Sequence, residues 1–175
     1  MGNYIGFDLS LSSTGFAVVT DKGVLLDSGV IKSKQKGVKR LLEITEKVIS
    51  LFVRYEPILI CIEGYGFASN TVAWSAELGG HVKCELEKAG ATYLIVGPNQ
   101  LKKFVTGKGA GKKNIVMMHA FKKYGIEFDD DNECDAFILA MIAQAYVEDI
   151  ELNKAQQEVM KKLRGENGKR KATRS

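Results

Sequence analysis

The stretch YIGFDLSLSSTGFAVV, residues 4–19, decides the fold, because its pattern is typical of two buried β-strands joined by a polar turn. The first of these strands ends at Asp8. Aspartate is disfavoured in strands, and it is costly to bury unless it is paired or binds a metal ion. Asp8 therefore either closes an ordinary turn, as aspartate often does, or belongs to a functional site.

The composition predicts one domain in a soluble, cytoplasmic protein. A chain of 175 residues with 45% hydrophobic content can build one well-packed core. The three cysteines are Cys61, Cys84 and Cys134. They show no CxxC spacing and lie in apolar stretches, so we expect reduced, buried thiols and neither disulfides nor a zinc site. The N-terminus has no basic-then-apolar leader, and no apolar run approaches the roughly 18 residues of a membrane span. We expect no membrane partner.

Positive charge is concentrated at the C-terminus. The net charge is +4, and residues 161–175 contain seven Lys or Arg against one Glu. We expect one domain over 1–150, then over 151–175 the end of the C-terminal helix and a basic, disordered tail that is solvated, binds nucleic acid, or both. A second basic group, for which a solvated surface is an equally good interpretation, comprises Lys32, Lys34, Lys36, Lys39 and Arg40.

The order of the predicted elements indicates an α/β fold. Strand-like runs at 3–9, 14–20 and 24–31 predict an antiparallel meander, and apolar residues at helical spacing follow from 38 to 52. Strands at 58–63 and 92–96 then alternate with helices, which we expect at 71–88, 99–105, 114–124 and 132–148. The prediction is a mixed five-stranded sheet, with three antiparallel strands followed by two parallel ones, flanked by helices.

Three carboxylates are predicted to converge. A right-handed crossover that places the fourth strand beside the first brings Asp8 and Glu63 to the same edge of the sheet. Asp135 lies near the start of a helix so apolar that it must be buried, although the acids just before it are also typical helix caps. Carboxylate oxygens are the ligands that Mg²⁺ prefers, so the three acids together suggest a magnesium site.

Four segments carry a resemblance to a known family: GFDLSLSSTGFAV, CIEGYGF, GPNQLKKFVTGKGAGKKNIV and NECDAFILA, in that order, within residues 3–145. In these segments the chain resembles the RuvC-like Holliday-junction resolvases of the RNase H-like superfamily, and it looks like a divergent or phage-borne member. The resemblance implies a homodimeric, metal-dependent endonuclease that binds four-way DNA junctions and nicks two strands symmetrically. It also implies that Asp8, Glu63 and Asp135 bind metal and that Lys102 and Lys113 lie near the active site and the DNA.

The implied chemistry is two-metal hydrolysis with Mg²⁺, for which Mn²⁺ can substitute. Asp8 would bridge the ions, Glu63 and Asp135 would each complete one side, and Lys113 or Lys102 would offset charge on the phosphate. The chain departs from the family at Asn132, where an Asp, or sometimes a His, is usual. An amide oxygen can bind a cation without adding charge.

Asn132 and Asp131 lie three and four residues before Asp135, so in a helix both share its face. Asp131 could therefore supply a further oxygen to the predicted metal site, beside or in place of Asn132.

The segments around the predicted site suggest DNA contacts. Glycines in TGKGAGKK, residues 106–113, would let Lys108, Lys112 and the backbone approach a phosphate, although a solvated loop is the simpler interpretation. Tyr65 and Phe67 follow Glu63 and either stack on bases or, as aromatics more often do, pack in the core.

Two rival interpretations remain open. The opening hairpin also resembles the phosphate-binding hairpin of actin-like sugar kinases and chaperone ATPases, but that fold needs two such lobes and no second hairpin follows. We therefore expect no nucleotide cofactor. The other rival is a branched-DNA-binding protein that does not cleave, an interpretation that Asn132 keeps open.

Overall fold

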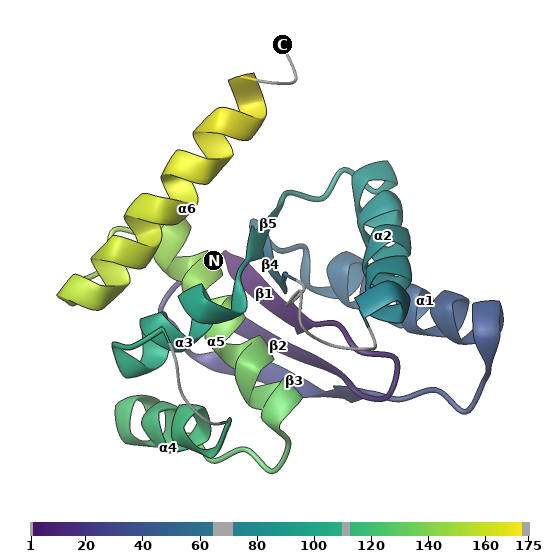
Figure 1. Cartoon of the computed structure of the whole chain (residues 1–175), viewed down its shortest axis with the longest axis horizontal. Coiled ribbons are helices and arrows are strands. Elements are labelled where there is room, and N and C mark those ends of the chain that lie inside the picture. The colour runs from purple at the N-terminus through teal and green to yellow at the C-terminus, as the bar shows by residue number, and fades with distance from the viewer. Residues whose placement is uncertain (1, 65–71, 110–112, 173–175) are drawn as a thin grey trace.

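The structure, a computed structural model, describes residues 2–64, 72–109 and 113–172. A central sheet carries helices on both faces (Figure 1). The elements in chain order are β1 Asn3–Asp8, β2 Thr14–Thr20, β3 Leu25–Ile31, α1 Gly37–Tyr55, β4 Leu59–Glu63, α2 Val72–Lys88, β5 Tyr93–Val96, α3 Pro98–Thr106, α4 Lys113–Tyr124, α5 Asp131–Val147 and α6 Lys154–Ala172.

The sheet confirms the predicted α/β architecture. Its strand order is β3-β2-β1-β4-β5, with β1, β2 and β3 antiparallel and with β4 parallel to both β1 and β5. β1 is therefore the central strand, as the crossover argument required. Helices cover both faces of the parallel part, which explains why β4 is an almost continuous apolar run.

Alternation along β1 divides the core into two layers. Ile5 and Phe7 pack with α1 and α2 on one face of the sheet, whereas Tyr4 packs on the other face with α5. α5 is buried along most of its length, because α3 and α4 pack against the side that does not contact the sheet, and α6 packs in turn against α3. The apolar composition of α5 follows from this central position.

The C-terminal segment differs from the expectation. α6 is helical over Lys154–Ala172, where we expected a disordered tail. Its buried side chains recur at helical spacing and join the core beneath α5; they are Gln156, Val159, Met160 and Leu163. The apolar positions anchor this helix despite its basic composition. The division of the chain near residue 150 stays a prediction.

The cysteines are free thiols, of which Cys61 and Cys134 are buried as predicted. Cys84 is exposed, which corrects the expectation that all three are buried, because it lies on a face of α2 that does not contact the sheet. Among the described residues, no helix combines the length and the apolar composition that crossing a membrane requires.

Candidate active site

Asp8 and Glu63 come together at the carboxyl ends of two neighbouring parallel strands. Phe7 of β1 is in register with Ile62 of β4, so the last residues of both strands are neighbours. Both side chains face α5, because side chains two positions apart in a strand lie on the same face, and Gly6 and Cys61 both lie on the α5 side of the sheet. The two carboxyl groups act directly on each other, because the charge of Asp8 and a hydrogen bond to it both raise the pKa of Glu63.

Two glycines let α5 approach the sheet closely enough to bring Asp135 to these carboxyls. A Cβ on Gly6 would lie 1.9 Å from the carbonyl oxygen of Ala136, and one on Gly15 would lie 2.0 Å from that of Asn132. Gly15 is the residue of β2 directly opposite Asp8. The backbone of the first turns of α5 therefore lies directly on the strand pair that carries Asp8.

The N-terminus of α5 is fixed by a side-chain cap. Asp130 accepts hydrogen bonds from the backbone N–H groups of Asn132 (2.9 Å) and Glu133 (3.4 Å). Ser13, in the turn after β1, donates to the other oxygen of Asp130 at 3.4 Å. The β1–β2 turn and the start of α5 are thus linked, which sets the position of Asp135 one turn into the helix.

The electrostatics of this cluster are those of crowded carboxylates. The pKa of Glu63 is raised well above its ordinary value, first by burial, then by the charge of Asp8 and the hydrogen bond to it, and also by the charge of Asp135. Lys102 on α3 opposes this rise and lowers the pKa of Glu63. Asp8 is only 9% exposed. Three acids and one lysine therefore interact within one partly buried site.

The donor set fits a divalent cation. Among the described residues, no group of three or more His, Cys, Asp or Glu side chains is already placed to hold a metal ion. The three carboxyls nevertheless act on one another, and their oxygens are hard ligands. A cation bound by these carboxyls would offset the like-charge repulsion that raises the pKa of Glu63.

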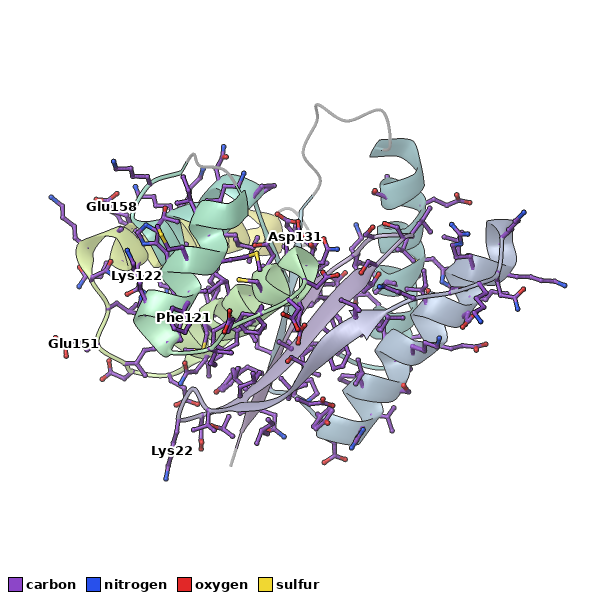
Figure 2. All side chains as sticks on the ribbon, turned by 90° about the horizontal axis from the view of Figure 1, so that it is seen from below. Lys22, Phe121, Lys122, Asp131, Glu151 and Glu158 are labelled. Atoms are coloured by element: carbon purple, nitrogen blue, oxygen red, sulfur yellow. The ribbon has the colours of Figure 1, made fainter. Side chains whose placement is uncertain are left out.

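The other polar residues at the start of α5 are Glu133, Asn132 and Asp131. Glu133 accepts a hydrogen bond from Ser28 of β3 at 2.6 Å, so it is directed away from Asp135. Asn132 lies over Gly15, beside the carboxyl cluster, and Asp131 begins α5 (Figure 2). Whether Asn132 or Asp131 binds metal stays a prediction.

The predicted DNA-contacting residues are only partly described. Lys108 is exposed in the turn after α3, where its backbone N–H and carbonyl both bond the Thr106 hydroxyl at 3.0 and 2.9 Å. Lys113 begins α4, but its side chain lies outside the described residues. Lys112, Tyr65 and Phe67 also lie outside them.

Sequence reasoning missed several residues that support the site. Gln100 of α3 is 8% exposed and accepts a hydrogen bond from the Gly97 N–H at 2.7 Å, which fixes the start of the helix that carries Lys102. Its amide nitrogen has no hydrogen-bond partner among the described residues. Gly6 was detectable in principle, because a glycine inside a buried strand indicates a close backbone approach.

Comparison with known proteins places this arrangement in a family. The model of the family "Crossover junction endodeoxyribonuclease RuvC" matches residues 4–143. The chain is 28% identical over 145 residues to the RuvC of Prochlorococcus marinus strain NATL2A, an alignment that covers 78% of this chain and 94% of that protein. It is 27% identical over 147 residues to the RuvC of Synechococcus sp. strain WH7803, with 78% and 94% covered. The chain belongs to the RuvC family of crossover junction endodeoxyribonucleases.

Solved structures show the same fold. The RuvC of Thermus thermophilus aligns with a TM-score of 0.68 and 24% identity, covering 79% of this chain and 91% of that one. The same protein in complex with a Holliday junction substrate aligns with a TM-score of 0.68 and 23% identity, with 81% and 92% covered. The fowlpox virus Holliday junction resolvase aligns with a TM-score of 0.57, 12% identity and 83% and 99% covered.

Proposed function

We propose that this protein is a metal-dependent endonuclease that binds four-way DNA junctions and other branched DNA and nicks their phosphodiester bonds. Membership of the RuvC family supports the reaction class. The observation that carries the proposal is the contact between the carboxyls of Asp8 and Glu63, within the field of Asp135 and Lys102, at the carboxyl edge of the sheet.

Asp8, Glu63 and Asp135 are the proposed metal ligands, and the ions are Mg²⁺, or Mn²⁺ in its place, two per site. When bound, such ions supply an activated water and stabilise the leaving oxygen. Glu63 must release its proton before it can bind a cation, because ligating carboxylates are deprotonated. Asp8, central in the sheet and hydrogen-bonded to Glu63, is the proposed bridging ligand.

The lysines hold and orient the DNA. Lys102 is close enough to Glu63 to lower its pKa, so its charge can also act on a phosphate brought to the carboxyls. Lys113 is the proposed second cation of the active site. Lys108 and Lys112 would contact neighbouring phosphates, and Tyr65 and Phe67 would stack on bases exposed where the junction opens.

We further propose that two copies act together. One chain supplies one carboxyl cluster, whereas two symmetric nicks in one junction require two sites. α1 offers a surface for this pairing, because Leu42 (44% exposed) and Val53 (65% exposed) border a cavity of about 640 Å³ between α1 and α2. Two nicks in a single binding event would follow from this dimer.

A nicking assay tests the proposed function. A four-way junction, labelled in turn on each strand, is incubated with the protein and Mg²⁺, with EDTA and a linear duplex of the same sequence as controls. The proposal expects paired nicks in two strands of the junction, none in EDTA, and far fewer on the duplex. Junction binding without nicking at any Mg²⁺ or Mn²⁺ concentration would instead indicate a protein that binds branched DNA and does not cleave it.

A further inference from the structure

A strongly basic surface lies beside the carboxyl cluster, in the connection between β3 and α1. Residues 28–42 contain five Lys or Arg and no Asp or Glu. We call residues 32–40 the basic connection. Its three central lysines, Lys34, Lys36 and Lys39, are all exposed. Such a density of one sign of charge attracts an anionic partner.

The basic connection is held in place by α1. Lys47 donates to the carbonyl of Lys32 at 3.1 Å and to Glu43 at 2.6 Å, and the hydroxyl of Ser33 donates to the other oxygen of Glu43 at 2.6 Å. At the other end, Arg40 donates from Nε to a backbone carbonyl of the connection at 2.7 Å. Because these bonds fix the backbone, an anion can be bound with less loss of conformational entropy than on a free loop.

The positive charge of the connection is not neutralised locally. Glu43, the next acid along the chain, is already paired with Lys47. The ion pairs found among the described residues do not include Lys34, Lys36 or Lys39. α1 also has no acidic residue in its first turn. Beside Lys36 and Arg40 lies a cavity of about 470 Å³, and Glu77 is the single acidic residue among the described residues that line it.

The register of the sheet places this surface next to the active site. Asp8 pairs with Gly15, and the adjacent Thr14 pairs with Ile31, so β3 ends at the same edge of the sheet as β1. In Figure 1 the chain leaves β3 for α1 on the side where the β1–β2 turn also lies. Two strand spacings of about 4.8 Å put the start of the basic connection roughly 10 Å to the side of Asp8.

We propose that the basic connection binds the phosphate backbone of the duplex arm that flanks the cleaved strand. This inference rests on the proposed function, because it takes DNA at the carboxyl cluster as its reference point. Phosphates of one strand advance about 3.4 Å along the duplex axis, so a lateral distance of roughly 10 Å to the start of the connection puts its lysines at least about three phosphates from the cut. The connection thus extends the DNA path from the lysines on the α3 side of the cluster to its β3 side.

The test compares two sets of exposed lysines by junction binding. The test variant is Lys34→Gln/Lys36→Gln/Lys39→Gln in the full chain, and the matched control, which removes the same charge elsewhere, is Lys22→Gln/Lys122→Gln/Lys154→Gln. Lys22 and Lys122 lie well away from Asp131 in Figure 2. Affinity for a fluorescent junction is measured by anisotropy in EDTA, so that no cleavage occurs, over a series of salt concentrations.

In the test variant the slope of log affinity against log salt should become less negative by up to about 2.7, since each phosphate contact contributes about −0.9. The control should keep the parent slope. A Lys34→Arg/Lys36→Arg/Lys39→Arg variant, which retains the charge, should also behave as the parent. A test variant with the parent slope, or a control that loses as much as the test variant, would overturn the proposal.

The outcome does not depend on catalysis. If the parent binds junctions but never nicks them, the proposed nuclease function is wrong, and the salt slopes of the variants still test whether the basic connection binds DNA. If the parent nicks and the test variant binds like the parent, only the inference about the basic connection fails.

Discussion

The close packing of α5 on Gly15 yields the sharpest structural prediction. Gly15→Ala would put a Cβ 2.0 Å from the carbonyl oxygen and 2.3 Å from the carbonyl carbon of Asn132. Cβ atoms do not approach backbone atoms more closely than 3.0 Å, so the first turn of α5 must move by about 1 Å. Asp135 lies one turn further along the same helix, and it should move away from Asp8 and Glu63.

We expect a shift of this size to lower the nicking rate about 10²-fold at saturating Mg²⁺ and DNA, because a displacement of about 1 Å in a catalytic constellation has effects of that order. Overpacking should also lower the free energy of unfolding by about 1–3 kcal/mol. Junction binding in EDTA should change little, since phosphate contacts supply most of the affinity. The assays are initial nicking rates on a labelled junction and thermal unfolding.

Two controls separate geometry from stability. Gly80→Ala adds the same methyl group where nothing lies within 4 Å, so it should nick at the parent rate. Val159→Ala shortens a side chain of α6 that is 2% exposed, so it should reduce stability without moving Asp135. The reasoning is refuted if Gly15→Ala nicks within about twofold of the parent, or if Val159→Ala loses as much activity as Gly15→Ala.

Three further predictions address the lysines, the C-terminus and Asn132. Lys102→Glu should reduce nicking much more than Lys154→Glu, and equal losses would make Lys102 an ordinary surface residue. Deleting residues 165–175, which spares the buried Leu163, should make the slope of log affinity against log salt for non-specific duplex binding less negative by at least about 1. An unchanged slope would show that the C-terminal segment does not contact DNA. In a Mg²⁺ titration of nicking, Asn132→Asp should match or exceed the parent, whereas Asp135→Asn should be nearly inactive. Near-parent activity of Asp135→Asn would show that Asp135 does not bind the metal.

Much of the fold could be predicted because its signals are local. The alternation in residues 4–19 and the apolar run of β4 predict buried strands, and the handedness of crossovers then predicts their order. α6 was missed because its basic composition obscured four buried positions at helical spacing. Composition describes the solvated face of such a helix, whereas the spacing of a few apolar residues decides whether it docks.

The sequence predicted only the part of the site that strand order and strand register determine. Asp8 and Glu63 follow from strand order and parallel register, so the sequence could place them together. The approach of Asp135 depends on backbone contacts at Gly6 and Gly15, which involve residues more than 100 positions apart and leave little trace in local pattern. The cap by Asp130 was visible as a cluster of acids, but its contact with Ser13 was not.

The central claim is that the carboxyl cluster performs metal-dependent cleavage, and Asp8→Asn tests it most directly. The substitution keeps the size of the side chain and removes its charge. Its matched control is Asp149→Asn, at an exposed position. With a labelled four-way junction and Mg²⁺, Asp8→Asn should nick at least about 10²-fold more slowly than the parent. Its junction affinity in EDTA should stay within a few-fold of the parent, and Asp149→Asn should nick at the parent rate. Nicking by Asp8→Asn at the parent rate would contradict the account.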